Sequence, residues 1–134
     1  MKTIFVDTNI FLRLYLNDIP EQAKRAKRIF KQAEQGKVLL TTNALVIFEC
    51  NYALDRLYGK HKTEVVKLLN TLLDTPGLYL EQHDVMREAL QLFTSHSVGF
   101  VDAYNVAWGR AHKVSHIFSF DKDFKKIPGI KLIS

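Results

Sequence analysis

The chain has 134 residues and a mass of 15.5 kDa, a length that suits one compact domain. Nineteen Lys and Arg residues against fourteen Asp and Glu residues give a net charge of +5, and 47% of the residues are apolar. This composition is that of an ordinary globular protein and excludes a disordered tail, a collagen-like chain and a coiled coil. We expect a single domain over residues 1–134. Its one cysteine, Cys50, excludes an internal disulfide and suits a reducing compartment.

Neither a membrane span nor a targeting segment is visible in the sequence. The apolar start of the chain stops at Asp7, too early for a signal peptide. The longest uninterrupted apolar run covers only residues 44–48, far below the ~20 residues of a membrane helix. We therefore expect a cytoplasmic protein that does not associate with a membrane.

Short β-rich apolar segments alternate with helical patterns along the chain. We expect strands at residues 3–6, 38–41, 78–80, 116–120 and, at an edge, 130–133. We expect helices at residues 10–16, 20–35, 43–58, 63–73, 84–95 and 99–113. This alternation predicts right-handed crossovers and a mostly parallel, roughly five-stranded sheet with helices on both faces, a three-layer α/β/α sandwich.

Acidic residues fall where such a sheet places its functional site, beyond the carboxyl ends of the strands. Asp7 follows the first strand, Asp121 follows the fourth, and Asp102 lies in the first turn of the helix that Gly99 opens. Glu49 lies in the apolar segment LVIFEC, which predicts a carboxylate on an apolar helix face. A buried carboxylate needs a cation or a hydrogen-bond donor.

Each acid also has a simpler interpretation. Asp7 can be a helix cap, Asp102 can interact with the helix dipole, and Asp121 and Asp123 can form a turn. Glu49 can be exposed on a helix of different phase. Together, clustered carboxylates repel one another unless a cation neutralises them, and sites made only of oxygen ligands suit Mg²⁺ or Mn²⁺.

Polar side chains near these acids can support such a site. Asn9 follows Asp7 by two residues, Asn105 shares a helix face with Asp102, and Ser119 precedes Asp121 on the same side of the strand. We expect Phe118 and Phe120 to lie in the core and hold the fourth strand in place.

These motifs follow one pattern from the first strand to the last. Asp-Thr-Asn after an apolar strand, LVIFEC, FVDAYNVA and SFDKDFKKIPGIKLI resemble the PIN domain family, and most closely the small VapC-type toxins of toxin–antitoxin operons. The resemblance covers nearly the whole chain. One departure is Ser119, where the family typically has Thr.

The resemblance implies an endoribonuclease that depends on Mg²⁺ or Mn²⁺ and hydrolyses RNA with a metal-activated water. Asp7, Glu49, Asp102 and Asp121 match the acidic quartet of the family. The metal, one ion or two, would be held chiefly by Asp7 and Asp102, with Asp121 and Asp123 completing the site through water. Glu49 would orient or deprotonate the attacking water. We expect Asp121 to be a primary acid of the site, and Asp123 to be a water-mediated or auxiliary one that caps the following turn.

Three other interpretations remain open. A ribonuclease can use two histidines as acid and base, but no pairing is evident among His61, His83, His96, His112 and His116. A magnesium-dependent phosphatase of the haloacid-dehalogenase type needs a second acid where this chain has Asn9. A PIN-like protein can bind RNA or a partner without catalysis. Cys50, on an apolar helix, is more consistent with packing than with nucleophilic chemistry.

Two surfaces are candidates for binding partners. Basic residues opposite the apolar stripe of the second helix, and one beside Asp121, either form a solvated face or contact RNA phosphates: Lys24, Arg25, Arg28, Lys31 and Lys122.

The helix at residues 10–16 is apolar almost all round, so it is either buried or presents a patch to a partner. The resemblance implies a cognate antitoxin protein and a homodimer. We expect the antitoxin to bind over Phe11, Leu12, Tyr15 and the second helix.

Overall fold

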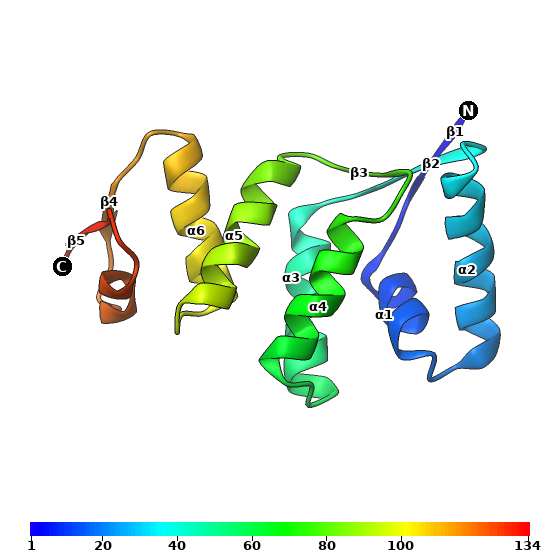
Figure 1. Cartoon of the computed structure of the whole chain (residues 1–134), viewed down its shortest axis with the longest axis horizontal. Coiled ribbons are helices and arrows are strands. Elements are labelled where there is room, and N and C mark those ends of the chain that lie inside the picture. The colour runs from blue at the N-terminus through cyan, green and yellow to red at the C-terminus, as the bar shows by residue number, and fades with distance from the viewer. The chain divides into compact units, whose positions relative to one another are not determined.

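The computed structural model describes residues 1–134, which divide into two compact units, Met1–Glu81 and Gln82–Ser134 (Figure 1). The first unit contains, in order, β1 (Lys2–Phe5), α1 (Thr8–Leu16), α2 (Pro20–Glu34), β2 (Val38–Thr42), α3 (Ala44–Tyr52), a π-helical turn (Ala53–Leu57), α4 (Lys62–Leu73) and β3 (Leu78–Leu80). The second contains α5 (His83–Ser95), α6 (Phe100–Ala111), β4 (His116–Phe118), a 3₁₀ turn (Lys122–Lys126) and β5 (Lys131–Ile133).

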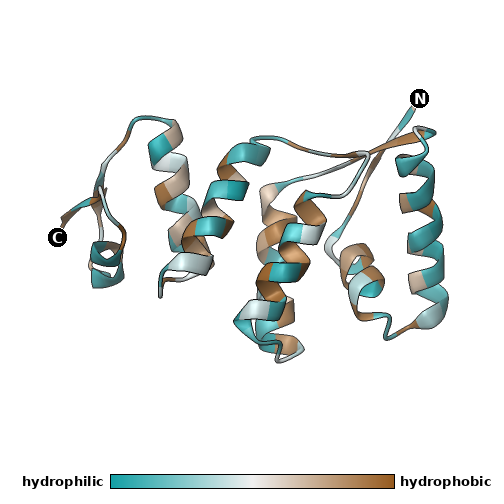
Figure 2. Ribbon diagram, in the orientation of Figure 1, coloured by the Kyte–Doolittle hydropathy of each residue, from teal (hydrophilic) through white to brown (hydrophobic).

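The sheet of the first unit is parallel, with strand order β1-β2-β3. Leu40 at its centre and Leu80 on β3 are buried, so one face of the sheet packs against the helices of this unit. The opposite face carries the exposed side chains of Phe5, Leu39 and Tyr79. The helix α2 is mostly hydrophilic in Figure 2, and its buried side is made of small residues and one ring: Ala23, Ala26, Phe30 and Ala33.

Local sequence signals set the starts of the helices. Asp7 caps α1 by accepting a hydrogen bond from the N–H of Thr8, 2.8 Å away. Asn43 caps α3 through the N–H of Val46, at 3.1 Å. Pro20 occupies the first turn of α2, where its missing N–H costs nothing. The expected long helix at 43–58 is α3 continued by the π-helical turn.

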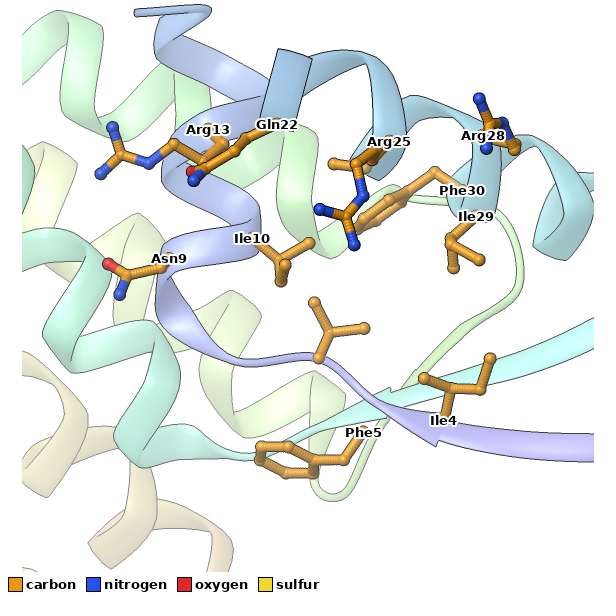
Figure 3. Close-up of a pocket in the computed structure, with 12 residues that line it drawn as sticks. Ile4, Phe5, Asn9, Ile10, Arg13, Gln22, Arg25, Arg28, Ile29 and Phe30 are labelled. Carbon is orange, nitrogen blue, oxygen red and sulfur yellow. The ribbon is translucent and has the colours of Figure 1, made fainter. Parts of the chain in front are cut away.

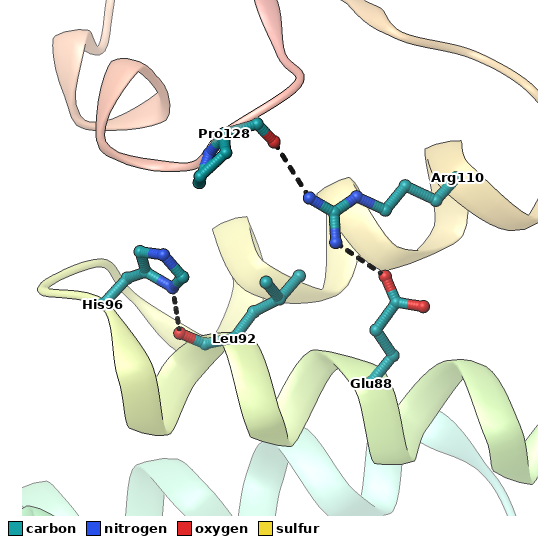
Figure 4. A network of polar contacts seen from close by, with 5 residues as sticks. All are labelled: Glu88, Leu92, His96, Arg110 and Pro128. Carbon is teal, nitrogen blue, oxygen red and sulfur yellow. Dashed lines mark hydrogen bonds and ion pairs between the residues drawn. The ribbon is translucent and has the colours of Figure 1, made fainter.

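In the second unit α5 and α6 pack side by side, and β4 pairs with β5 in parallel (Figure 1). Arg110 on α6 connects two parts of this unit (Figure 4): its guanidinium donates to Glu88 Oε1 on α5 at 3.1 Å and to the carbonyl of Pro128 at 2.9 Å. The turn that precedes β5 is thereby attached to the helical pair.

The end of the fourth strand differs from the prediction. β4 stops at Phe118, not at residue 120, and the expectation that Phe118 and Phe120 lie in the core is wrong for the second unit, because these residues are 73% and 84% exposed. The physical reason is that Phe124 and Ile127, in and just after the 3₁₀ turn, supply the buried apolar side chains of this segment instead.

Every strand pair is parallel, and strands alternate with helices, which confirms the predicted α/β class. The five expected strands are divided three plus two between the two sheets. None of the helices combines the length and the apolar character that a membrane crossing requires. The single domain over residues 1–134 stays a prediction.

Candidate active site

Thr8 brings together two acids that are far apart in the sequence. Its main-chain N–H donates to Asp7 Oδ1 at 2.8 Å, and its hydroxyl donates to Glu49 Oε1 at 3.1 Å. The charges of both acids also act on the buried thiol of Cys50. Burial raises the pKa of this thiol to about 12, and the charges of Glu49 and Asp7 make smaller contributions. Thr8 therefore connects Asp7, after β1, with Glu49 of α3 in the first unit.

Glu49 is not the buried carboxylate that the apolar sequence around it predicts, because its residue is exposed. The buried stripe of α3 is formed by Val46, Ile47 and Cys50, and Glu49 lies beside it. Its charge is therefore solvated and needs no cation for folding. Cys50 is fully buried with a raised pKa, which agrees with the packing role expected for it.

Asp102 faces other acids in the second unit. It lies in the first turn of α6, is half-buried, and has a pKa above its usual range. Burial is the largest cause, followed by the negative charges of Asp121 and Asp123. The charges of Asp121 and Asp123 therefore lie close enough to disfavour the ionised form of Asp102.

Asp121 and Asp123 are held differently. The N–H of Asp121 donates to Ser119 Oγ at 3.0 Å, and Asp121 Oδ1 accepts the N–H of Asp123 at 2.9 Å. Asp121 thus caps the 3₁₀ turn, so the expectation that Asp123 provides this cap is wrong. The reason is that the turn begins earlier than expected, at Lys122. Asp123 instead forms an ion pair with Lys126, at 3.0 Å.

The acidic quartet is divided between the two units. Asp7 and Glu49 belong to the first, and Asp102, Asp121 and Asp123 belong to the second. No group of three or more His, Cys, Asp or Glu side chains is arranged to hold a metal ion. The donor chemistry nevertheless fits Mg²⁺ or Mn²⁺, because carboxylates are the ligands these cations prefer, and Asp121 and Asp123 lie near Asp102.

A groove of about 700 Å³ lies beside Asp7, between α1, α2 and β1 (Figure 3). Ile10 and Ile29 point into it from the two helices, and Ile4 of β1 contributes to its floor. Two of the predicted basic residues, Arg25 and Arg28, line it. Five other residues that the sequence predicts to support the site or to bind RNA are exposed: Asn9, Lys24, Lys31, Asn105 and Lys122. Of these, only Asn9 lines the groove.

The apolar surface of α1 is not the one that the sequence predicts. Phe11 and Leu12 are core residues, and the hydroxyl of Tyr15 is buried as well. A binding surface over these three residues is therefore wrong. Their side chains turn inwards because Phe11 packs against Phe30 of α2, with 5.7 Å between the ring centroids. Ile10 is the apolar residue of α1 that is exposed beside the groove.

These observations define a parallel α/β protein with carboxylates after its strands. The sequence profile of the PIN domain family matches residues 4–130, and the chain therefore belongs to that family. Family membership confirms the PIN-like fold class predicted from the sequence.

Individual relatives are similar over most of the chain. A VapC ribonuclease of Aquifex aeolicus is 23% identical over 129 residues, which are 96% of this chain and 94% of that protein. The structure of Mycobacterium tuberculosis VapC20, described as a Sarcin-Ricin loop cleaving toxin, is 25% identical, covering 91% of this chain and 92% of the other, with a TM-score of 0.41. VapBC2 from Rickettsia felis, bound to a promoter DNA fragment, is 16% identical, covering 99% and 98%, with a TM-score of 0.39. Because both TM-scores lie below 0.5, the family assignment depends on the sequence match.

Proposed function

We propose that this protein is a divalent-cation-dependent endoribonuclease and the toxin of a VapBC-type toxin–antitoxin pair. The observation that carries the proposal is that Thr8 bonds to both Asp7 and Glu49, although Glu49 lies 41 residues from Thr8, on a chain whose sequence matches the PIN family. Burial and the nearby charges of Asp121 and Asp123 raise the pKa of Asp102, which gives further support, because a bound cation would favour its ionised form.

A divalent cation held by Asp7, Asp102, Asp121 and Asp123 would supply Lewis acidity toward the scissile phosphate and activate a water molecule. The chain's own residues provide the rest of the chemistry. Glu49 is exposed, and the hydroxyl of Thr8 fixes one of its oxygens. The other oxygen is available to orient a water or accept its proton. Arg25 and Arg28 in the groove offer phosphate contacts next to the Asp7 end of β1.

Cleavage of a structured RNA tests the enzymatic proposal. Purified protein is incubated with the RNA and, separately, with a generic phosphomonoester, each with Mn²⁺ and with EDTA. We expect the protein to cleave the RNA but not the phosphomonoester, and to do so only with Mn²⁺ or Mg²⁺. The products should carry 5′-phosphate and 3′-hydroxyl ends, because water and not the ribose 2′-hydroxyl attacks. Asp7→Asn serves as the control for a contaminating nuclease, and it should abolish the cleavage.

The alternatives give other results in the same assay. Products ending in a 2′,3′-cyclic phosphate, formed equally in EDTA, would point to histidine acid–base catalysis. Hydrolysis of the phosphomonoester alone would indicate a phosphatase. Retention of RNA without cleavage in any metal would indicate a binding protein.

The groove between α1 and α2 is where we propose that the antitoxin binds. Its apolar residues Ile10 and Ile29 suit apolar anchors of a peptide, and Arg25 and Arg28 suit acidic side chains beside them. This proposal moves the antitoxin surface from the buried Phe11 and Leu12 to the exposed Ile10. The homodimer stays a proposal, to be tested by light scattering of the isolated protein.

A further inference from the structure

Thr8 stands between two acids of the proposed site and contacts both. Its N–H holds Asp7 Oδ1 and its hydroxyl holds Glu49 Oε1. We infer that Thr8 is a positioning residue, which sets the arrangement of Asp7 relative to Glu49 and leaves one oxygen of each carboxylate to the cation or the attacking water. This inference rests on the proposed nuclease function and deepens it.

The burial of Thr8 makes its hydroxyl bond to Glu49 obligatory. Only 7% of the residue is exposed, and a buried hydroxyl without a partner costs about 1–3 kcal/mol. Glu49 lies 41 residues away on a different helix, so this bond is a tertiary contact between α1 and α3 and not a feature of local chain geometry. The hydroxyl therefore holds one position of the exposed Glu49 side chain.

The main-chain bond of Thr8 has a separate origin. Thr8 is the first residue of α1, and the first N–H groups of a helix have no partner within the helix. Its N–H is therefore free to hold Asp7. Because both bonds come from one buried residue, the two carboxylates cannot move apart without breaking one of them.

Each carboxylate uses a single oxygen in these bonds. Asp7 accepts through Oδ1 and Glu49 accepts through Oε1. Asp7 Oδ2 and Glu49 Oε2 consequently stay available as donors of lone pairs. Without the hydroxyl of Thr8, Glu49 would lose its fixed rotamer and turn toward water, while Asp7 would keep its main-chain contact.

Two substitutions of Thr8 distinguish the effect of its hydroxyl group from the effect of its side-chain shape. Thr8→Val keeps the branched side chain but removes the donor, and Thr8→Ser keeps the donor. Neither substitution leaves a buried group unpaired, since Glu49 is exposed and can bond to water, so both variants should fold. The readouts are Mn²⁺ affinity by titration calorimetry without RNA, the rate of RNA cleavage, and the melting temperature in EDTA.

We expect Thr8→Val to weaken Mn²⁺ binding and to slow cleavage by about 10- to 100-fold, as observed when residues that orient metal ligands are removed. Thr8→Ser should stay within about threefold of wild type, because it retains the bond. In a Glu49→Ala background Thr8→Val should cause no further loss, because its effect acts through Glu49.

Several results would overturn the inference. One is an equal effect of Thr8→Val with and without Glu49; another is a lowered melting temperature with unchanged Mn²⁺ affinity and cleavage, which indicates a structural role alone. Wild-type activity retained by Thr8→Val would overturn the inference and leave the nuclease proposal standing. A wild-type protein that neither binds Mn²⁺ nor cleaves RNA would overturn both.

Discussion

Asp121 accepts a hydrogen bond from the main-chain N–H of Asp123, with 2.9 Å between Oδ1 and N. The first acid is therefore fixed at the start of the 3₁₀ turn, while the second reaches outward to an ion pair with Lys126. A spacing of two residues, which in an extended strand would make these carboxylates equivalent, gives them different constraints in a turn.

Asp121→Asn should lower nuclease activity by orders of magnitude and leave the fold intact, because asparagine also caps turns but lacks the charge. Asp123→Asn should cost roughly tenfold, as expected for an auxiliary residue. Cleavage rates at saturating Mn²⁺ and circular dichroism of both variants check this. The assignment of ligands at this end is wrong if Asp123→Asn proves the more damaging change while both variants remain folded.

Asp102→Asn should stabilise the metal-free protein at neutral pH. The pKa of Asp102 is raised in the folded state by burial and by Asp121 and Asp123. Between its ordinary pKa and the raised one, the folded protein binds more protons than the unfolded chain, so the free energy of unfolding falls as pH rises through that window. Above the raised pKa of Asp102 the free energy of unfolding remains lower by this amount. Asparagine carries no charge and therefore removes this loss of stability.

Urea denaturation in EDTA at neutral pH and below the ordinary pKa of aspartate measures this difference. We expect the free energy of unfolding of Asp102→Asn to be higher than that of wild type at neutral pH. Below the ordinary pKa of aspartate the two free energies should be equal. Mn²⁺ should reduce the difference in the free energy of unfolding between the variant and wild type at neutral pH, because it stabilises wild type. A variant less stable than wild type at neutral pH would mean that the attraction of Asp102 to the helix dipole outweighs the repulsion.

Ile10→Glu should weaken antitoxin binding by at least tenfold, because it places a charge on the apolar side of the groove. Ile19→Glu is a matched control: Ile10 and Ile19 are 41% and 42% exposed, and Ile19 does not line the groove. Titration calorimetry with the product of the neighbouring reading frame measures both. Equal affinities for the two variants would place the antitoxin elsewhere.

Gly77→Ala should destabilise the protein more than Gly59→Ala. Both glycines have positive φ, at 75° and 63°, so alanine costs about 1–2 kcal/mol of backbone strain at either position. At Gly77 an added Cβ would also lie 2.6 Å from the carbonyl oxygen of Ala33, whereas nothing lies within 4 Å at Gly59. Thermal melting of both variants checks the order, and similar losses would show that the chain relaxes at Gly77.

Signals that act within a few residues made much of the fold predictable. Asn43 begins α3 and Pro20 begins α2, while Gly36, with φ of 75°, follows the end of α2. These residues act through their own backbone preferences, which do not depend on tertiary contacts. The predicted positions of Asp7 and Asp121 after strands depended on the same kind of signal.

Features set by tertiary packing were not predictable. The helix α1 is apolar on nearly every side, so its sequence does not tell whether Phe11 or Ile10 faces the core; contact with Phe30 decides it. The role of Thr8 was missed because its partner Glu49 lies 41 residues away. A threonine between an acid and an amide carries no local sign of such a bond.

The attachment of the C-terminal strands has a consequence for how the protein loses activity on heating. Strands β4 and β5 pair over three residues each, which is too little to persist unsupported. Arg110 and the side chains of Phe124 and Ile127 keep this segment on the helical pair. Because Asp121 lies within it, local opening there should inactivate the enzyme at a lower temperature than the one that melts the helices. Thermal inactivation would then precede the loss of helical circular dichroism, and Arg110→Ala would widen the interval.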